Sequence, residues 1–433
     1  MKHIAERVFR ETLAAVSIPA AFEKKIARDG SSIRAGGLIV DLREFREVVA
    51  IAFGKAAYPM AQCLGELLAP KYAPHGIVVA PTAPPRALPG WKTFIGGHPV
   101  PNAESFAAGR AILSLLEKCD ERTLVLFLIS GGGSSLVELP LDPAMPLEDF
   151  QELHAVLVTC GASIGEINAV RKHLSATKGG RLAAAAPRSV KLTLAVSDVP
   201  PGDESTIASG PSLPDPTTIR DAMRIARKYK LLGKFPKHIR AAFQGQSLQE
   251  TPKDGDAAFA RAYFLLLLGA HDLTHAAHHA CEAEGYVCLC DNSTDGWPVG
   301  KAADYLLAEL KAQKKRYASA PVAVLSDGEV SCPVTGCGIG GRNSAFALAC
   351  VRKIAGKNIT VLSAGTDGID GNSPAAGAVA DGETLARART AHLDPADFLR
   401  RSDAHNFFSR LGDAIVTGPT GNNLRDLRIL LMA

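Results

Sequence analysis

The chain has 433 residues, of which 47% are hydrophobic and 21% charged, and its formal net charge is +4. This length exceeds what one core usually supports, so we expect two domains, each with its own apolar interior. The composition excludes a disordered or fibrous protein. The basic residues are scattered along the chain, which argues against nucleic acid as a partner and suits small anions such as carboxylates and phosphates.

The N-terminal segment at 1–16 alternates charged and apolar residues at helical spacing, which predicts an amphipathic helix rather than a signal peptide. The longest apolar runs, at 124–129 and 264–268, are too short to cross a bilayer. Nine cysteines without C-x-x-C spacing predict reduced, mostly buried thiols. We therefore expect a cytoplasmic protein with no membrane partner, and self-association into a homo-oligomer stays open.

Short β-rich runs alternate with helical stretches along almost the whole chain, which is typical of parallel sheets covered by helices. The predicted strands form two sets, at 48–53, 76–80, 123–129 and 191–197, and at 263–268, 321–326, 359–363 and 413–417. The polar, turn-rich segment 244–257 lies between the two sets. We therefore predict an N-terminal α/β domain at 1–250 and a C-terminal α/β domain at 251–433.

Polar loops that contain glycine follow six of these strands, and in open α/β sheets ligands bind at the carboxyl ends of the strands. These loops contain Gly54-Lys55 and residues 130–135, 198–204, 327–329, 365–371 and 417–421. The sequence therefore predicts that the functional residues lie at the carboxyl ends of the strands.

The sequence SGGGSS at 130–135 follows an apolar strand. Because its three glycines have no side chain, backbone N–H groups could approach an anion, and the serine hydroxyls add further donors. An ordinary tight turn is the alternative. No P-loop pattern and no G-x-S-x-G nucleophile elbow occurs. The candidate phosphate- or carboxylate-binding residues of this loop are Ser130, Gly131, Gly132, Gly133, Ser134 and Ser135.

Residues 336–341 satisfy the dinucleotide pattern G-x-G-x-x-G formally. No Asp or Glu occurs in 342–366, whereas an NAD site needs an acid about 20 residues beyond the glycines. Arg352 or Lys353 could instead hold the 2′-phosphate of NADP, so this alternative stays open.

Four further residues are candidates for binding an anion. Arg342 and Asn343 follow the glycine-rich turn at an expected helix start, where a guanidinium fork can hold a phosphate or carboxylate. Arg171 and Lys178 stand in an apolar helical context. Charges on helices usually form a solvated face, but the cluster as a whole indicates an anion site.

Acidic residues also concentrate in the strand-end loops, where magnesium ligands and catalytic bases are expected. Magnesium needs only one or two carboxylates beside phosphate oxygens and water. Loop aspartates also cap helices and make turns, which is the competing interpretation. The acidic candidates are Asp198, Asp203, Glu329, Asp367 and Asp370.

His271, His275 and His279 recur at every fourth position of a predicted helix. A His-x-x-x-His pair can bind zinc, yet a third protein ligand and an open coordination position are also needed, and no accompanying carboxylate motif is evident. We therefore interpret them as a partly exposed helix face.

Seven segments together resemble the class II glycerate kinase family, whose C-terminal half is the MOFRL domain. They are FGKAAYPMA (53–61), GGHPVPNAES (96–105), LISGGGSSLVELP (128–140), EINAVRKHLSATKGGRLA (166–183), SDVPPGDESTIASGPSLPDPTT (197–218), TDGIDGNSPAAGA (366–378) and VTGPTGNNLRDLRI (416–429). The sequence departs from the family pattern at Asp327, at Ser344 and Ala345, and at Asn422.

The resemblance implies two Rossmann-like domains with mostly parallel sheets and an active site in the interdomain cleft. It implies ATP with Mg²⁺ or a similar divalent cation, and D-glycerate phosphorylated at its 2-hydroxyl. Lys55 and Arg342 would be cations near the transferring phosphoryl group, and Asp198 the base or substrate orienter. Thr417 and Thr420 join the acids as nucleotide or metal candidates.

Two other functions stay open. Members of the family have also been described as hydroxypyruvate reductases, so an NAD(P)H-dependent reductase is the alternative enzyme. A non-catalytic protein that binds small anions is the third option.

Overall fold

The computed structural model describes residues 1–200, 202–245 and 247–433, so Pro201 of the predicted 198–204 loop and Gln246 of the predicted boundary segment lie outside the described residues. The chain divides into two compact units. The central unit is Ala21–Leu267, and the terminal unit combines Met1–Ala20 with Leu268–Ala433.

The central unit contains a six-stranded sheet in the order β6-β5-β4-β7-β8-β9, and its pairs from β6 to β8 are parallel. All residues of β7 are buried, because helices cover the sheet, and this explains the continuous apolar run. The strands are β4 (Glu47–Phe53), β5 (His75–Ala80), β6 (Trp91–Ile95), β7 (Thr123–Ile129), β8 (Val190–Val196) and β9 (Ala262–Leu268).

The strand order of this sheet reverses between β4 and β7. The chain runs outward from β4 through β5 to β6, and then returns to build β7, β8 and β9 on the other side of β4. Such a reversal leaves a crevice at the carboxyl ends of the two central strands, where ligands of open α/β sheets bind. The loops after β4 and β7 therefore meet at the position expected for a site.

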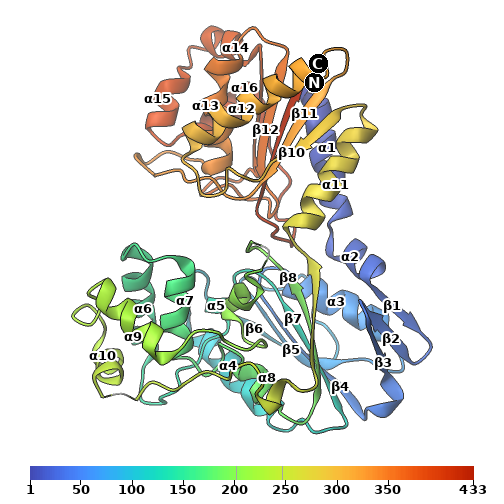
Figure 1. Ribbon diagram of the computed structural model, residues 1–433, viewed down its shortest axis with the longest axis vertical. Coiled ribbons are helices and arrows are strands. Elements are labelled where there is room, and N and C mark those ends of the chain that lie inside the picture. The colour runs from blue at the N-terminus through green and yellow to red at the C-terminus, as the bar shows by residue number, and fades with distance from the viewer. Residues whose placement is uncertain (201, 246) are drawn as a thin grey trace. The chain divides into compact units, whose positions relative to one another are not determined.

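Helices surround this sheet, and four of them, α6, α7, α9 and α10, share a separate apolar core beside it (Figure 1). α3 packs on β4, β5 and β7, and α4 packs on β5 and β6. The helices are α2 (Ile18–Lys25), α3 (Ala57–Leu68), α4 (Ala103–Leu116), α5 (Gly133–Leu136), α6 (Leu147–Thr159), α7 (Ile164–Lys172), α8 (Arg181–Ala184), α9 (Ile219–Lys228) and α10 (Lys237–Gln244). Short 3-10 turns are η1 (Leu42–Glu44), η2 (Glu204–Ser209) and η3 (Ala257–Phe259).

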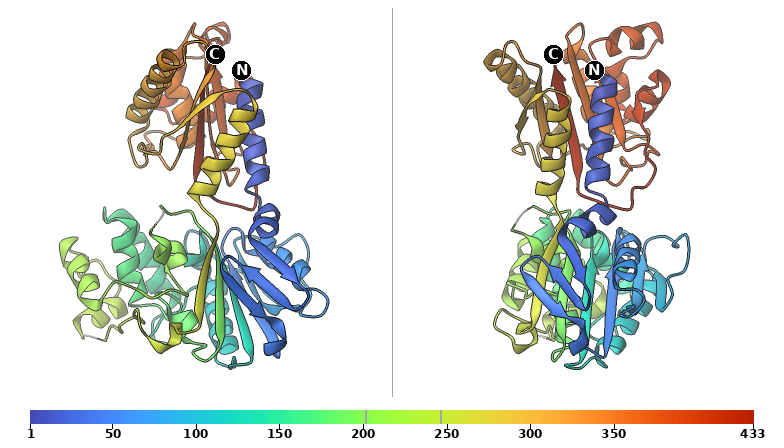
Figure 2. Two further views of the ribbon diagram at one scale, coloured as in Figure 1. Left: turned by 45° about the vertical axis from the view of Figure 1, so that its right-hand side comes forward. Right: turned by 90° about the vertical axis from the view of Figure 1, so that its right-hand side faces the viewer.

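A small antiparallel sheet precedes the main sheet of the central unit (Figure 2). Its strands are β1 (Ile26–Asp29), β2 (Ser32–Ala35) and β3 (Leu38–Asp41).

The terminal unit contains a second six-stranded sheet, in the order β10-β11-β15-β12-β13-β14. β10 and β11 are parallel, whereas every other neighbouring pair is antiparallel. The expectation of a mostly parallel sheet is thus corrected for this unit, because the last strand inserts between β11 and β12 in the opposite direction. The strands are β10 (Val287–Cys290), β11 (Val322–Asp327), β12 (Ile359–Gly365), β13 (Gly377–Asp381), β14 (Ala414–Ile415) and β15 (Asp426–Met432).

Helices cover both faces of the second sheet. α12 and α13 share one core with alternate residues of β11, Val322 and Val324. α1 lies beside α11, and these two contact the same sheet from the other face (Figure 2). The helices are α1 (Lys2–Ala15), α11 (Ala270–Ala283), α12 (Val299–Arg316), α13 (Arg342–Ile354), α14 (Thr384–Thr390), α15 (Pro395–Arg400) and α16 (Ala404–Leu411).

The division of the chain differs from the expected 1–250 and 251–433. α1 is amphipathic as predicted, but its buried stripe, which includes Val8 and Phe9, belongs to the terminal unit. The polar segment expected at the boundary lies in the central unit, where Thr251 donates to Asp215 Oδ2 at 3.0 Å. β9 then adds to the edge of the central sheet, so the boundary follows it.

The cysteines and the helices test two other expectations. All nine cysteines are free, but only Cys119, Cys281 and Cys350 are buried, so the expectation of mostly buried thiols is corrected. Within the described ranges, no helix combines the length and apolar character that a membrane span requires.

The carboxyl ends of β4 and β7 approach each other closely at Gly54, whose φ is +120°. A Cβ atom at Gly54 would lie 2.5 Å from the carbonyl oxygen of Ser130, a separation that packed atoms do not tolerate. This position therefore requires glycine both for its backbone angle and for its neighbour.

We predict that Gly54→Ala destabilises the protein by at least about 2 kcal/mol, because the variant adds backbone strain to a clash with a buried strand end. This corresponds to a melting temperature lower by about 4–8 °C in thermal denaturation. The matched control is Gly65→Ala in the interior of α3, where an added Cβ meets no atom within 4 Å. The Gly65→Ala control should melt at the wild-type temperature or higher. Equal melting temperatures for the two variants would contradict the packing argument.

Candidate functional site

The turn after β4 is joined to the 130–135 loop by backbone hydrogen bonds. The N–H of Lys55 donates to the carbonyl oxygen of Gly131 at 2.9 Å. The N–H of Ala56 donates to Ser130 Oγ, also at 2.9 Å. Ser130 is buried, so its hydroxyl serves this junction and is not presented to solvent. Lys55 is therefore fixed beside the glycine-rich loop.

Asp198, in the loop after β8, lies against the same glycines. A Cβ at Gly131 would lie 2.0 Å from Asp198 Oδ2. A Cβ at Gly132, whose φ is +82°, would lie 3.5 Å from Lys55 Cγ and 3.1 Å from His98 Nε2. The structure thus brings Lys55, the SGGGSS loop and Asp198 together, as predicted, and adds a histidine.

The residues missed from sequence include His98 and His154. Burial lowers the pKa of His98, and the charge of Lys55 lowers it further. Burial also lowers the pKa of His154, with contributions from Arg171 and His98. Both imidazoles are therefore neutral near pH 7. His98 stands in the GGHPVPNAES segment of the family resemblance, which was the available signal.

The second half of the loop is held by side chains of α7 and η2. Ser134 Oγ lies 2.6 Å from Ser209 Oγ, and Ser209 Oγ donates to Asn168 Oδ1 at 2.9 Å. Arg171 Nη2 donates to the carbonyl oxygen of Ser134 at 3.3 Å. Ser135 and Gly133 are buried at the start of α5.

Arg171 and Lys178 are buried, so the interpretation of these cations as a solvated face is wrong. Glu138, which is 1% exposed, pairs with Lys178 Nζ at 2.9 Å and with Arg171 Nη2 at 3.7 Å. Burial lowers the pKa of Lys178 to about 8, although Glu138 acts in the opposite direction. Ser175 also donates to Glu138. These charges form a buried layer beneath the loop.

Arg342 begins α13 in the terminal unit, as the turn at 336–341 predicted. Its Nε donates to Asp426 Oδ2 at 2.6 Å, and its Nη2 lies 2.7 Å from Glu329 Oε1. Burial lowers the pKa of Arg342, but the two carboxylates more than reverse this effect and raise it overall. Asp426, which was missed, lies in the predicted 416–429 segment.

Asp370 caps α13 instead of facing solvent. Its carboxylate accepts N–H groups from Asn343 at 2.9 Å and from Ser344 at 2.8 Å, together with the Ser344 hydroxyl at 2.6 Å. Asn343 is itself buried and donates to Asp426 Oδ1 at 2.9 Å. Asp370 therefore has the helix-capping role that is common for loop aspartates. Asn343 helps to hold Asp426, the carboxylate that pairs with Arg342.

The remaining candidates occupy loops. Asp203 precedes η2 with an exposed side chain. Asp367 Oδ1 accepts the N–H of Ile369 at 3.1 Å. Thr417 donates to the carbonyl oxygen of Gly418 at 2.8 Å, and Thr420 donates to that of Thr366 at 2.6 Å. The Thr417 hydroxyl therefore bonds within its own loop, whereas the Thr420 hydroxyl ties that loop to the 365–371 loop.

The candidates thus form one cluster in each unit, with Lys55 and Asp198 in the central unit and Arg342 and Glu329 in the terminal unit. Across 1–200, 202–245 and 247–433, no group of three or more His, Cys, Asp or Glu side chains could hold a metal ion. Carboxylates such as Glu329 would have to share a magnesium ion with phosphate oxygens and water.

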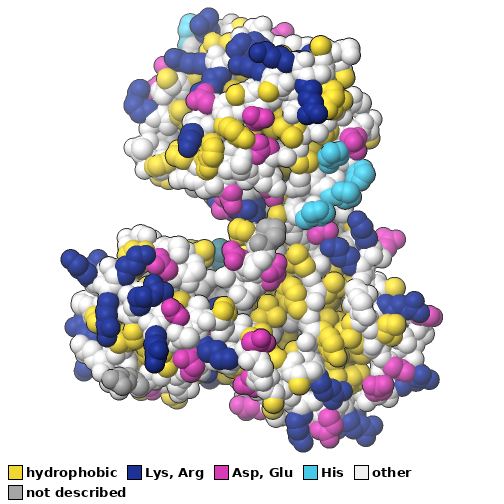
Figure 3. Space-filling model, in the orientation of Figure 1, with side chains coloured by type: hydrophobic (Ala, Val, Ile, Leu, Met, Phe, Trp, Pro, Cys, Tyr) yellow, Lys and Arg dark blue, Asp and Glu magenta, His cyan; other side chains and the backbone are white. Residues whose placement is uncertain are grey.

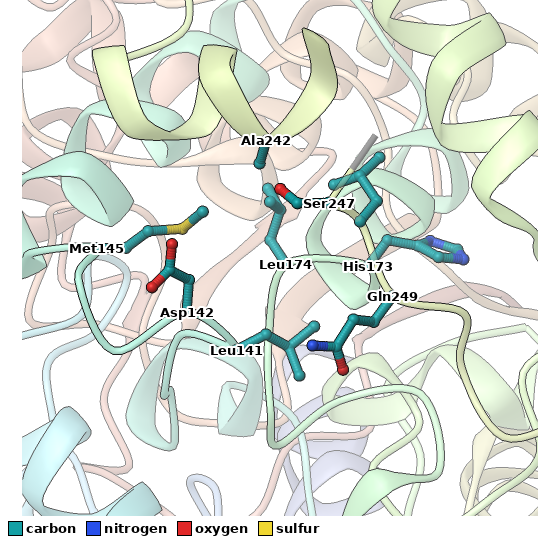
Figure 4. A pocket seen from close by; sticks show the side chains of 9 residues that line it. Leu141, Asp142, Met145, His173, Leu174, Ala242, Ser247 and Gln249 are labelled. Atoms are coloured by element: carbon teal, nitrogen blue, oxygen red, sulfur yellow. The ribbon is translucent and has the colours of Figure 1, made fainter. Parts of the chain in front are cut away.

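A cavity of about 290 Å³ lies elsewhere in the central unit (Figure 4). Leu141, Met145, Leu174 and Ala242 give it apolar walls, and the carboxylate of Asp142 is near them. Its lining residues differ from those of the SGGGSS loop and Lys55, so it is a separate feature.

The chain is similar, along most of its length, to proteins that bear two different enzyme names. Residues 4–244 match the domain of unknown function DUF4147, and residues 322–426 match the MOFRL family. The D-glycerate 2-kinase of Thermotoga maritima is 35% identical over 389 residues, which is 89% of this chain and 90% of that protein. A protein of Agrobacterium vitis that bears a hydroxypyruvate reductase name is 37% identical over 393 residues, 89% of this chain and 87% of its own.

A solved structure resembles the whole chain. The crystal structure of the Thermotoga maritima glycerate kinase superposes with a TM-score of 0.86 at 32% identity. The match covers 100% of this chain and 99% of that one.

We predict that Glu138→Gln lowers stability at pH 7 by about 3 kcal/mol or more, because it leaves buried cations without their counter-charge. The control Glu121→Gln removes the exposed pair with Arg188, at 3.5 Å, and should change stability by less than about 1 kcal/mol. Equal melting temperatures for the two variants would contradict this account.

The loss in Glu138→Gln should shrink as pH rises. Without Glu138 the pKa of Lys178 falls further below its value of about 8, so the folded variant lacks a proton that the unfolded chain keeps up to about pH 10. The stability of the variant then rises with pH across that window. The folded wild type lacks this proton only above about pH 8, so the gap between the two proteins should narrow up to about pH 8 and stay level above it. Melting curves at pH 7, 8 and 9.5 test this trend, and a gap to the wild type that widens with pH would oppose it.

Proposed function

The chain belongs to the glycerate kinase family whose members join a DUF4147 domain to a MOFRL domain, and from this premise we propose that it transfers the γ-phosphoryl group of ATP to the 2-hydroxyl of D-glycerate. The products are 2-phosphoglycerate and ADP. The observation that carries the proposal is the meeting of Lys55, the SGGGSS loop and Asp198 at the reversal of strand order in the central sheet.

This cluster suits phosphoryl transfer because the reaction depends mainly on positioning and on positive charge around the transferred group. Because the loop glycines have no side chains, an anion can approach the backbone there, either the carboxylate of glycerate or a phosphate. The oxygen of the glycerate 2-hydroxyl attacks the γ-phosphorus, and Asp198 accepts the proton that this hydroxyl loses. The bond from phosphorus to the bridging oxygen breaks at the same time, and ADP leaves. Lys55 stabilises the charge on the transferring phosphoryl oxygens.

Neutral His98 adds a hydrogen-bonding group beside Lys55 without adding a second positive charge. We assign it to orienting glycerate next to the loop. Its lowered pKa keeps it uncharged near pH 7.

Arg342 acts as the second cation. Asp426 is buried and accepts from both Nε and Nη2 of the guanidinium, whereas Glu329 is 41% exposed and meets Nη2. An arriving phosphate can take the place of Glu329, and Asp426 keeps the guanidinium oriented meanwhile. Glu329 is then released to bind the cation that accompanies ATP.

Magnesium would screen the phosphate charge and orient the γ-phosphoryl group when it is bound with ATP. Glu329, Asp367 and Asp203 are the acids of this chain that suit a hard cation, since each supplies carboxylate oxygens. Asp370 suits it least, because the start of α13 already occupies both of its oxygens.

The reductase alternative is weaker on this chain's own residues. No Asp or Glu occurs in 342–366 to hold the ribose hydroxyls of NAD. The glycines at 336–341 approach another segment: a Cβ at Gly338 would lie 2.8 Å from the carbonyl oxygen of Arg401. This packing leaves the glycine loop less open to a dinucleotide.

The direct test compares two assays on the purified protein. ADP formation from ATP and D-glycerate is measured by anion-exchange chromatography, and NAD(P)H oxidation with hydroxypyruvate is followed by absorbance. Glycerate-dependent ADP release without NAD(P)H turnover supports the kinase. The opposite pattern would establish the reductase, and neither activity would favour an anion-binding protein. A cytoplasmic location and a homo-oligomer stay predictions.

We predict that Lys55→Ala and Arg342→Ala each lower kcat by roughly 10²- to 10³-fold, because both stabilise charge that builds in the transition state. Steady-state kinetics at saturating ATP measure the effect. The controls are Lys118→Ala, at an exposed lysine, and Arg352→Ala, on the same helix as Arg342. If only KM for glycerate rises, the two cations bind the ground-state carboxylate instead.

We also predict that kinase activity needs a hard divalent cation. Excess EDTA should abolish ADP formation, and Mg²⁺ added above the chelator should restore it. ADP is quantified by chromatography because enzymes commonly used for coupling need Mg²⁺ themselves. Melting curves with and without EDTA show whether the fold is affected. Undiminished activity in excess chelator would refute the requirement.

A further inference from the structure

The helix α11 carries a row of histidines that the proposed kinase reaction does not use. His271, His275 and His279 are exposed, with 66% of the His279 side chain accessible. Figure 3 shows histidine side chains gathered along one edge of the terminal unit, over α11. Because residues four apart share a helix face, the row follows from the sequence spacing.

The spacing of two ring nitrogens distinguishes His275 and His279 within this row. Their Nε2 atoms share a hydrogen bond at 3.1 Å, and their rings meet edge to face at 4.4 Å. A metal ion bound to both would replace this hydrogen bond and displace its proton. An ion bound to both nitrogens at about 2.0–2.1 Å, with tetrahedral or octahedral angles, would hold them about 2.9–3.4 Å apart. The pair therefore already has the separation that one metal ion requires.

The other ring nitrogen of His279 faces a carboxylate. Glu282 Oε2 lies 3.8 Å from His279 Nδ1. This separation is too long for a hydrogen bond, but the charge of the carboxylate still favours the proton on Nδ1, which leaves the Nε2 lone pair for a metal. The sequence showed no carboxylate motif beside these histidines, but Glu282 lies one helical turn beyond His279.

We infer that His275 and His279 form a surface site for a divalent transition metal of the Zn²⁺, Ni²⁺ and Cu²⁺ class. Imidazole nitrogens suit these ions, whereas the hard Mg²⁺ of the kinase reaction prefers oxygen ligands. Water completes the coordination, in keeping with the lack of any three-residue metal group among the described residues. The site is distinct from Arg342 and Lys55.

A neighbouring pair offers a rival site. His278 Nδ1 lies 3.4 Å from Cys290 Sγ, and its Nε2 lies 3.0 Å from Glu282 Oε1. The two nitrogens of His278 contact two different partners, whereas the Nε2 atoms of His275 and His279 contact each other at a spacing that one ion can bridge. The experiment must therefore separate the two pairs.

The test is isothermal titration of the full chain with Zn²⁺ at pH 7.5 in a non-coordinating buffer. The protein carries no histidine tag and is stripped with chelator beforehand. The variants are the double change His275→Asn with His279→Asn, and the rival change His278→Asn with Cys290→Ser. His3→Asn, at an exposed histidine of α1, is the matched control.

The wild type should bind about one equivalent, and the His275/His279 variant should lose at least tenfold in affinity. His3→Asn should bind like the wild type. Zn²⁺ should raise the melting temperature of the wild type and not of the double variant, since a ligand that binds only the folded state stabilises it. Binding should weaken as the pH is lowered, because protons compete with the metal for the imidazole nitrogens.

Three results would overturn the site. They are unchanged affinity in the His275/His279 variant, loss of binding in the His278/Cys290 variant alone, or no wild-type binding at millimolar Zn²⁺. The substituted histidines of the first variant are exposed, so the fold should survive, and circular dichroism checks that it does. Kinase activity plays no part in the readout, so the outcome is independent of the proposed function.

Discussion

The close approach of two backbone turns, at Gly54 after β4 and at Ser130 after β7, is the constraint on which the candidate site depends. A Cβ at Gly54 would meet the Ser130 carbonyl oxygen at 2.5 Å, so the two central strands can end together only without that side chain. The same junction fixes Lys55 against Gly131. Asp198 packs on that glycine from the next strand. The absence of a side chain at Gly54 therefore allows Lys55, the SGGGSS loop and Asp198 to lie together.

Charge compensation supports this arrangement in both units. Glu138 offsets Arg171 and Lys178 beneath the loop, and Asp426 holds the guanidinium of Arg342. Charged side chains with fixed partners need little reorganisation when a phosphate arrives, which is how preorganised sites stabilise a transition state. Such groups also cost stability if one partner is removed, because an unpaired charge is then buried.

Many of the strands and several candidate site residues could be predicted from the sequence, because apolar runs and glycine-rich loops are local patterns. Apolar runs predicted eight strands, and each overlaps a strand of the structure, whereas seven other strands of the described residues, among them β6 and β15, were missed. Glycine-bearing loops at strand ends indicated Lys55 and Asp198, and the turn at 336–341 indicated Arg342. Features set by tertiary packing could not be read in this way. The burial of Lys178 depends on Glu138, far along the chain, and the unit boundary depends on where α1 and β9 pack. The reversed direction of β15 follows from its insertion between two distant strands.

The central claim, phosphoryl transfer to the 2-hydroxyl of D-glycerate, is tested most directly by proton-coupled ³¹P NMR of the product formed from ATP. A phosphate on the 2-hydroxyl is bonded through oxygen to a carbon with one hydrogen, so the account predicts a doublet that depends on enzyme and glycerate. A triplet would place the phosphate on the 3-hydroxyl, whose carbon carries two hydrogens. That result, or no new phosphate ester at all, would contradict the account.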